Sequence, residues 1–398
     1  MIREAIQQVV ERENLSAEVA QKVMAEMMEG KATPSQIASF ITAMRMKGET
    51  EDELRGFVMA MRNGATKVSA PEGAVDLCGT GGDGSNSFNI STTAAFVVAA
   101  AGVPVAKHGN RSVSSRCGSA DVLAALGIPV DLGQGQVEEC LSGSGIGFMF
   151  APVFHESMKN VLAPRREIGL RTFFNILGPM TNPANVRRQL IGIFDPRIAR
   201  KMAGVLRELG TERAMIVNGD GMDEITTLGK THIVELGDGG LREYDISPDM
   251  FGLDLAEPGD IKGGDAAENA RIMLSVLKGE RSRRSDIVAL NAAAAIYVAG
   301  RATSIHESLE IARDILKNGS GMIKLREFSS VARATEAARQ RTEDISKLRS
   351  RRILPEVLTE RSDEIVQTLL REVLARECGA ASVAVLDKDL LDSPSILS

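Results

Sequence analysis

The chain has 398 residues, of which 43% are apolar and 25% are charged, and its formal net charge is −6. These values are typical of a soluble globular protein with enough chain for two or three domains. The sequence has no prominent basic block, no tryptophan and only two tyrosines, so the charges and stacking rings that nucleic-acid binding uses are scarce. We therefore expect no nucleic-acid partner.

The cysteine pattern and the hydropathy exclude further classes of protein. The four cysteines and four histidines are scattered without a CxxC pair, which argues against a zinc site or a disulfide framework. No apolar run is long enough to cross a membrane, and the N-terminus opens on a charged amphipathic stretch instead of a signal core. We expect a cytoplasmic protein with reduced thiols and no membrane association.

The expected elements divide the chain into three parts. Residues 1–73 predict consecutive short helices, because apolar residues recur at helical spacing and Ser16 and Pro34 are typical of helix starts. We expect later helices around 166–190 to join this helical domain. Residues 74–333 alternate strands with helices, which predicts a larger α/β domain. The expected strands cover 74–78, 103–106, 214–218 and 232–236, and the expected helices cover 91–101, 197–209, 266–277 and 286–299.

The last part, residues 334–398, begins charged and helix-prone and ends in small and acidic residues. We expect a helical C-terminal extension of unknown role. It would be either a peripheral helix with a frayed tail or a contact for a partner.

A glycine-rich segment follows the first expected strand and reads DLCGTGGDGSNSFNIST over residues 76–92. Its glycines formally match the dinucleotide pattern GxGxxG, but Lys107 and its neighbours stand where such a site needs an acidic residue. Glycines let backbone N–H groups converge on an anion, and the following helix, which Ser91 and Thr92 can cap, adds partial positive charge. We therefore expect a phosphate-rich ligand, with Asp83 near its ribose and pyrophosphate; a plain turn is the alternative.

Two further groups of polar residues suit the same ligand. The second expected strand leads into KHGNRSVSS at 107–115, and this loop would face the glycine-rich segment across a cleft at the carboxyl ends of the strands. Arg165 follows Pro164 near an apparent helix end, where a guanidinium could recognise a carboxylate in bidentate fashion. Alternatively, Arg165 lies on a solvent-exposed helix face and has no binding role.

Adjacent carboxylates, Asp223 and Glu224, follow the expected strand 214–218. Mg²⁺ commonly binds one or two carboxylates together with substrate phosphates, and Ser91 could add a hydroxyl. An isolated Asp–Glu pair is usually solvated surface, but two phosphate-type loops beside it favour a Mg²⁺ site.

Short motifs follow one another along residues 1–333 and carry a family resemblance. They are GTGGDG at 79–84, NIST at 89–92, KHGNRSVSS at 107–115, GSADVLAALG at 118–127, FAP at 150–152, RTFFNILGP at 171–179, MDEIT at 222–226 and LNAAAA at 290–295. This set resembles the anthranilate phosphoribosyltransferase family, with Cys117 a small departure where the family usually has Ser. The residues after about 335 lie outside the resemblance.

The resemblance implies a fold and a reaction. The fold would be nucleoside-phosphorylase-like, a small helical domain on a larger α/β domain, with homodimers formed through the helical part. The reaction would transfer the phosphoribosyl group of phosphoribosyl pyrophosphate (PRPP) to the amine of anthranilate. It would give N-(5-phosphoribosyl)anthranilate and pyrophosphate in tryptophan biosynthesis. An anthranilate synthase subunit is a further partner to test.

The resemblance also implies which residues form the site. Anthranilate would contact Gly79, Asn110 and Arg165, whereas Mg²⁺ would be held by Ser91, Asp223 and Glu224. No residue is expected to form a covalent intermediate, and Lys107, His108 and Asn110 would position the substrates. PRPP would contact Gly79, Gly82, Asp83, Ser87, Asn89, Ile90, Ser91, Thr92, Lys107, His108, Gly109, Asn110, Arg111, Ser112, Val113, Ser114, Ser115 and Ser119.

Two other interpretations are open. A pyrimidine-nucleoside phosphorylase has a similar fold but uses phosphate on a nucleoside, and the Asp–Glu pair with the NIST motif favours PRPP over it. A non-enzymatic relative that binds nucleic acid is disfavoured by the acidic balance and the scarce aromatic residues.

Overall fold

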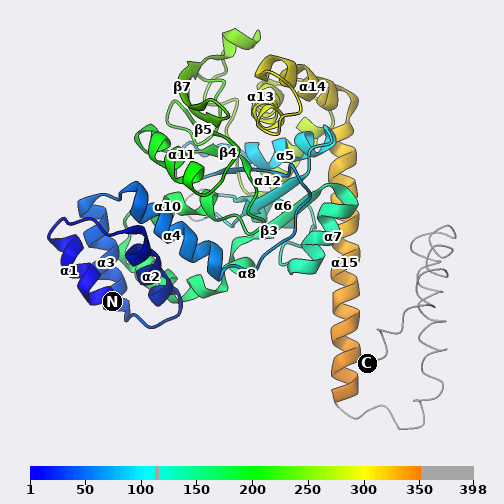
Figure 1. Ribbon diagram of the computed structural model, residues 1–398. Coiled ribbons are helices and arrows are strands. Elements are labelled where there is room, and N and C mark those ends of the chain that lie inside the picture. The colour runs from blue at the N-terminus through cyan, green and yellow to red at the C-terminus, as the bar shows by residue number, and fades with distance from the viewer. Residues whose placement is uncertain (113–115, 351–398) are drawn as a thin grey trace. The chain divides into compact units, whose positions relative to one another are not determined.

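The computed structural model describes residues 1–112 and 116–350, with side chains described as far as residue 343 (Figure 1). Four helices open the chain and pack as a bundle: α1 (Ile2–Val10), α2 (Ala17–Met28), α3 (Pro34–Lys47) and α4 (Glu51–Gly64). Their starts are set by local chemistry. Ser16 caps α2, and Thr33 and Thr50 form capping boxes at α3 and α4.

Two later helices, α9 (Lys159–Ile168) and α10 (Phe174–Leu177), contact this bundle. Phe173, just before α10, is buried in the bundle core, with its ring 4.4 Å from that of Phe57 and 6.3 Å from that of Phe40. The helices that join the bundle begin at Lys159, earlier than the range 166–190 expected from the sequence. The helix interrupted by Pro164 lacks a clear sequence boundary, which explains the difference.

The α/β part is built on one seven-stranded sheet with the strand order β3-β2-β1-β4-β5-β6-β7. The first five strands in this order pair in parallel, and β6 and β7 are antiparallel. The strands are β1 (Val75–Gly79), β2 (Val105–Gly109), β3 (Ile146–Phe150), β4 (Arg188–Gly192), β5 (Arg213–Gly219), β6 (Thr231–Gly237) and β7 (Gly240–Ile246).

The order in which successive strands are added to the sheet reverses between β1 and β4, although the two strands are parallel. Strands β1, β2 and β3 follow one another toward one edge, and β4 then returns to the other side of β1. Such a switch point opens a crevice at the carboxyl ends of the strands, where ligands of open α/β sheets bind. The loops after β1, β2 and β5 are therefore brought to the same edge.

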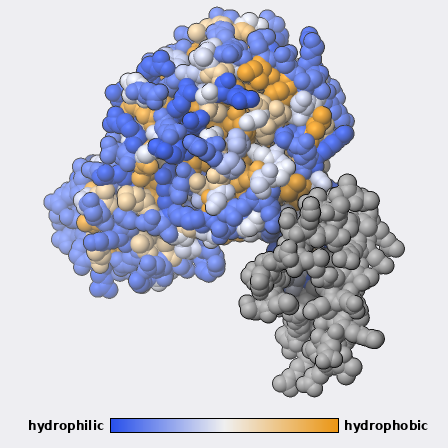
Figure 2. Space-filling model, turned by 45° about the vertical axis from the view of Figure 1, so that its right-hand side comes forward, coloured by the Kyte–Doolittle hydropathy of each residue, from blue (hydrophilic) through white to orange (hydrophobic). Residues whose placement is uncertain are grey.

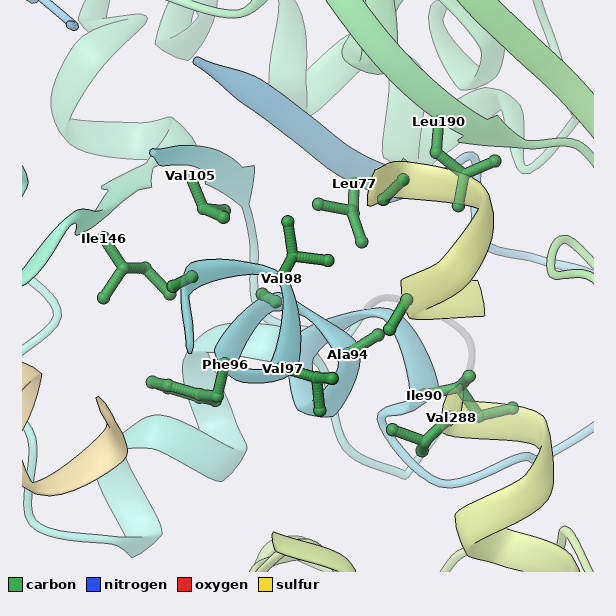
Figure 3. Close-up of a cluster of buried hydrophobic side chains, with 14 of the residues drawn as sticks. Leu77, Ile90, Ala94, Phe96, Val97, Val98, Val105, Ile146, Leu190 and Val288 are labelled. Atoms are coloured by element: carbon green, nitrogen blue, oxygen red, sulfur yellow. The ribbon is translucent and has the colours of Figure 1, made fainter. Parts of the chain in front are cut away.

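Helices cover both faces of the sheet. On one face α5 (Ile90–Ala100) is buried against the strands, and Figure 3 shows Leu77, Val105 and Leu190 directed toward it, with Val288 of α13 nearby. The next residue of β4, Ile191, points to the other face, where it joins the core shared with α11 and the helical bundle. This alternation is the two-residue repeat of a strand.

The remaining helices complete the α/β body around these cores. They are α6 (Ser119–Ala125), α7 (Gln134–Ser144), α8 (Ala151–Phe154), α11 (Ala199–Glu208), α12 (Ala266–Leu277), α13 (Arg283–Val298) and α14 (Ile305–Asn318). Short 3-10 turns cover Glu156–Met158, Gly178–Thr181, Pro196–Ile198 and Pro248–Phe251. On the face seen in Figure 2, hydrophilic residues predominate between smaller apolar patches.

The last described helix, α15 (Ser320–Ser350), begins within the α/β body. Phe328 is buried there, and the Arg333 guanidinium donates to the carbonyl oxygens of Leu126 and Gly127, where α6 ends. Residues up to 336 belong to the main body, and the described residues of α15 from 337 to 350 belong to a second unit. The expected helical extension is described only to residue 350, and 351–398 lie outside the described residues. Within the described part, no helix is both long and apolar enough to span a membrane.

Candidate functional site

The glycine loop, residues 79–84, connects the end of β1 to the segment before α5 (Figure 1). Gly81, Gly82 and Gly84 all have positive φ, between 68° and 77°, which side-chain-bearing residues rarely adopt. From the sequence we expected Ser91 and Thr92 to cap the next helix. They lie instead in its first turn, because α5 begins at Ile90 and Asn89 occupies the N-cap position without a side-chain capping hydrogen bond.

The chain after β5 turns back toward the glycine loop and brings Asp223 and Glu224 next to it. A tight turn at Asp220 and Gly221, both with positive φ, lets Gly219 and Met222 pair and reverses the chain. The Asp223 Oδ2 accepts the Gly81 N–H at 2.6 Å, and Glu224 Oε1 accepts the Ser91 N–H at 3.1 Å. Residues far apart in the sequence are thus joined directly at the start of α5.

A third carboxylate belongs to the same cluster. Asp83 accepts the backbone N–H of Asp223 through its Oδ2 at 3.3 Å. Burial first, and then the Asp83 charge, raise the pKa of Asp223 to about 7. Burial and the charge of Asp223 raise the pKa of Glu224 to about 8. Ionised, these groups repel one another in a poorly solvated place, and a divalent cation would relieve that repulsion.

The donor set fits Mg²⁺, because carboxylate oxygens are the hard ligands that this ion prefers. Among residues 1–112 and 116–350, no group of three or more His, Cys, Asp or Glu converges as a complete metal site. Mg²⁺ commonly keeps several waters and binds through one or two carboxylates together with substrate phosphates, so such an ion does not require a complete set of protein ligands.

Glycines on two neighbouring strands make room for Asp223. A Cβ built on Gly79 of β1 would lie 2.2 Å from Asp223 Oδ2, and one on Gly192 of β4 would lie 1.5 Å from the Asp223 carbonyl oxygen. Both separations are far below van der Waals contact, so the acid pair reaches the sheet edge only because these positions lack side chains.

We expect Gly192→Ala to displace the Asp223 main chain and to lower both stability and turnover. Overpacking of this kind costs about 1–3 kcal/mol, measurable as the free energy of unfolding in urea. Gly135→Ala is the matched control, because a Cβ at this helical position of α7 meets nothing within 4 Å. Wild-type values of stability and turnover in Gly192→Ala would contradict the steric argument.

Lys107 and His108 were expected in the loop after a strand ending at residue 106, and this is wrong. Strand β2 runs from Val105 to Gly109, so both residues belong to it. The Lys107 side chain is 3% exposed, and its ammonium donates to the carbonyl oxygen of Leu77. Its charge acts on the buried carboxylates of both Asp76 and Glu224. Lys107 is thus a buried counter-ion beside the acid pair.

His108 forms a buried pair with His155, a residue that sequence reasoning did not assign to the site. The two rings lie 5.1 Å apart, and His108 Nδ1 lies 3.2 Å from the Gly178 carbonyl oxygen. Burial lowers the pKa of His108 to about 3 and that of His155 to about 4, so both are neutral at physiological pH. Within the described residues, His108 Nε2 and both His155 ring nitrogens lack a hydrogen-bond partner. No sequence spacing linked the two residues.

The second loop is closed by Asp121, in the first turn of α6. Its carboxylate accepts the N–H groups of Ser112 and Gly118 at 3.0 and 2.8 Å and pairs with the Arg111 guanidinium at 3.0 Å. The Asn110 N–H donates to Ser119 Oγ at 3.2 Å. These contacts fix the loop backbone at Ser112 and Gly118. Val113, Ser114 and Ser115, which were also expected to contact PRPP, lie outside the described residues.

The two loops meet through Asn89, whose side-chain amide donates to the Cys117 carbonyl oxygen at 3.3 Å. Ser87, another of the expected PRPP contacts, pairs as an isolated β-bridge with Lys262. The structure therefore brings together the described residues of both loops, the start of α5 and the acid pair.

Arg165 is carried by a different segment, the last turn of α9. Its guanidinium carbon lies 4.6 Å from the centre of the Phe174 ring, and burial lowers its pKa to about 10, so the group stays charged. Across the described part of the chain, Arg165 makes no ion pair. A half-buried cation without an acidic partner can accept an anionic group of a ligand.

The similarity to known proteins extends over both parts of the fold. Residues 71–322 match the model of the glycosyl transferase family α/β domain, and residues 3–65 match that of its helical bundle domain. The anthranilate phosphoribosyltransferase of Acetivibrio thermocellus is 51% identical over 330 residues, covering 82% of this chain and 96% of the relative. That of Pelotomaculum thermopropionicum is 53% identical, with the same coverage. The chain belongs to the anthranilate phosphoribosyltransferase family.

A solved structure agrees with this assignment. The crystal structure of anthranilate phosphoribosyltransferase from Thermus thermophilus has a TM-score of 0.79 at 40% identity, covering 83% of this chain and 99% of that one. The predicted fold class, a helical domain with a larger α/β domain, is confirmed. The reaction of the family, transfer of a phosphoribosyl group to anthranilate, is the reaction of this chain.

Proposed function

We propose that phosphoribosyl transfer takes place at the carboxyl edge of β1, β2 and β5, with Mg²⁺ between the acid pair and the pyrophosphate of PRPP. The observation that carries this proposal is the convergence of three segments on one point. Asp223 accepts from the glycine loop, Glu224 accepts from the first turn of α5, and Asp83 contacts the Asp223 backbone. Anion-binding N–H groups and cation-binding carboxylates side by side suit a magnesium pyrophosphate.

In this proposal PRPP contacts the glycine loop, the start of α5 and the second loop. Mg²⁺ is held by Ser91, Asp223 and Glu224. When bound, the ion would neutralise charge that develops on the departing pyrophosphate. The structure of the anthranilate phosphoribosyltransferase from Saccharomyces cerevisiae in complex with PRPP and Mg, 24% identical, shares this fold.

The acceptor needs positioning more than activation. The amine of anthranilate is an aniline, neutral near pH 7, so its nitrogen can attack the ribose carbon as the bond to pyrophosphate breaks, and the amine proton is then released. Arg165 holds the anthranilate carboxylate, and Gly79 and Asn110 complete the acceptor contacts. His108 stays neutral, because burial lowers its pKa to about 3. Its role in this proposal is to orient the substrates. No covalent intermediate with the protein is required.

The same proposal includes a homodimer formed through the helical domain. Val10 of α1 and Met46 of α3 are 65% and 72% exposed, on helices that contact each other. Light scattering should give twice the mass of one chain, whereas a monomeric mass would overturn this arrangement. We also propose a cytoplasmic location, and association with an anthranilate synthase subunit stays a hypothesis that co-purification would test.

A fluorescence assay tests the reaction and its site together. The full-length protein with PRPP and Mg²⁺ should consume anthranilate, seen as loss of its fluorescence, and chelation of the metal should stop the reaction. Thymidine with phosphate is the comparison, since a pyrimidine-nucleoside phosphorylase would release thymine. Thymine release without loss of anthranilate would contradict the proposal.

A further inference from the structure

One segment carries both the acceptor-binding candidate Arg165 and a second arginine, Arg171. The segment is anchored at its end by Phe173, which packs in the core of the helical bundle. Gly169 ends α9 in the left-handed conformation, with φ of 64°. The Thr172 N–H donates to Asn175 Oδ1 at 2.9 Å at the start of α10. Arg171 therefore projects from a short connection whose backbone is held on both sides.

The Arg171 side chain reaches the glycine loop. Its guanidinium donates to the Gly82 carbonyl oxygen and lies over the ring of Phe194, 4.7 Å from the ring centre. Phe194, which follows β4, also touches the loop, because its N–H donates to Thr80 Oγ1 at 3.2 Å. Arg171 thus contacts the glycine loop at Gly82, and Phe194 contacts it at Thr80. We call these two residues the loop clip.

Within the loop clip, the contacts of Arg171 differ from those of an ordinary surface arginine. Arg171 is exposed, yet among the described residues no acidic side chain pairs with it, and its hydrogen bond goes to a carbonyl of the glycine loop. The next residue, Asp83, accepts the backbone N–H of Asp223. A shift of Gly82 would therefore move Asp83 relative to the acid pair.

We propose that Arg171 is a positioning residue that couples the two substrate sites. Through its hydrogen bond to Gly82, Arg171 fixes the position of the glycine loop relative to the segment that presents Arg165 to anthranilate. The glycine loop is the part that binds the PRPP pyrophosphate. This inference rests on the proposed function, because it takes the glycine loop as the PRPP site and Arg165 as the acceptor contact. Phe194 supports the guanidinium by stacking.

Steady-state kinetics of Arg171→Ala test the coupling. We expect the KM for PRPP to rise about tenfold, because PRPP would have to order a glycine loop that has lost one charge-assisted hydrogen bond. The KM for anthranilate should rise at least about twofold, because the glycine loop and the segment that carries Arg165 are no longer held together by the Arg171 contact. Arg171→Lys, which keeps a charged donor but not the planar stack, should restore part of the loss. Arg166→Ala, an exposed arginine on the same segment, is the control and should leave both KM values unchanged.

A double variant tests whether the clip acts as one unit. If Arg171 and Phe194 act together, Arg171→Ala with Phe194→Leu should raise the KM for PRPP no more than about twofold beyond the larger single effect. Independent, multiplicative effects would overturn the clip. A lowered Tm with unchanged KM values in Arg171→Ala would overturn the positioning role and leave only a structural one.

The increase in Tm on adding PRPP without anthranilate separates this inference from the proposed function. We expect PRPP to raise the Tm of the wild-type protein and to raise that of Arg171→Ala less at the same concentration. This result with no consumption of anthranilate would contradict the acceptor assignment while supporting the loop clip. Equal Tm increases in the two proteins would overturn the loop clip even if anthranilate is consumed.

Discussion

Replacing both acids of the pair, as Asp223→Asn with Glu224→Gln, should abolish Mg²⁺-dependent turnover. Both substitutions keep the size and shape of the side chain but remove the charges that hold the ion. Metal stabilisation of a leaving group is worth several kcal/mol, so we expect a loss of at least about 100-fold in kcat/KM. Turnover of anthranilate at a series of Mg²⁺ concentrations measures the effect.

The same double variant should be more stable than the wild-type protein when metal is absent. The pKa values of about 7 for Asp223 and about 8 for Glu224 lie above the usual carboxylate range. The folded protein therefore binds these protons more tightly than the unfolded chain does. Ionisation destabilises the wild-type fold progressively from about pH 4 upward, until the pH passes the folded pKa values. Above pH 8 the neutral variant should show the higher Tm.

Added Mg²⁺ distinguishes the metal site from a purely structural acid pair. It should raise the Tm of the wild-type protein and leave that of the double variant unchanged. Asp238→Asn with Glu257→Gln, two exposed acids outside the site, is the matched control and should behave like the wild-type protein. Retained Mg²⁺-dependent activity in the acid-pair variant would refute the metal assignment.

Arg165→Ala should raise the KM for anthranilate far more than the KM for PRPP. A charge-assisted hydrogen bond contributes about 1.5–3 kcal/mol, so we expect an increase of about 10- to 100-fold for anthranilate. Arg165 has no acidic partner within the described residues, so its removal leaves no buried carboxylate unpaired. Initial rates with each substrate varied in turn provide the measurement.

Two variants make the Arg165 result specific. Arg165→Lys keeps the charge but loses the planar fork over Phe174, so it should recover only part of the affinity for anthranilate. Arg166→Ala changes the neighbouring exposed arginine and should leave the kinetics unchanged. Equal increases in both KM values for Arg165→Ala would rule out a specific contact with the acceptor carboxylate.

The sequence predicted the elements whose signals are local. The glycine loop follows a short apolar strand, and β5 is a run of apolar residues ending at a turn, so both were found within one or two residues. Strands β3, β4 and β7 were missed. β3, IGFMF, is buried along its whole length and shows no alternation, a pattern that periodicity cannot distinguish from part of a helix.

The positions of Lys107 and His155 could not be predicted in the same way. Lys107 lies in a strand with its ammonium among Leu77, Asp76 and Glu224, which come from a neighbouring strand and a later turn. His155 contacts His108 because β2, which carries His108, pairs with β3, and His155 follows β3 by only a few residues. Such neighbours are separated by dozens of residues, and no local pattern records which strands pair.

The amino-acid sequence by itself determined the chemical groups available at the site: the glycine loop, the adjacent acids and the arginines near residue 165. It also determined the starts of α3 and α4, because capping residues act on N–H groups within three positions. Tertiary structure alone decided that Asp223 lies beneath Gly81 and that Arg171 contacts Gly82. These contacts depend on strand order and on the absence of a Cβ at Gly79 and Gly192, whose effect exists only once the strands are paired.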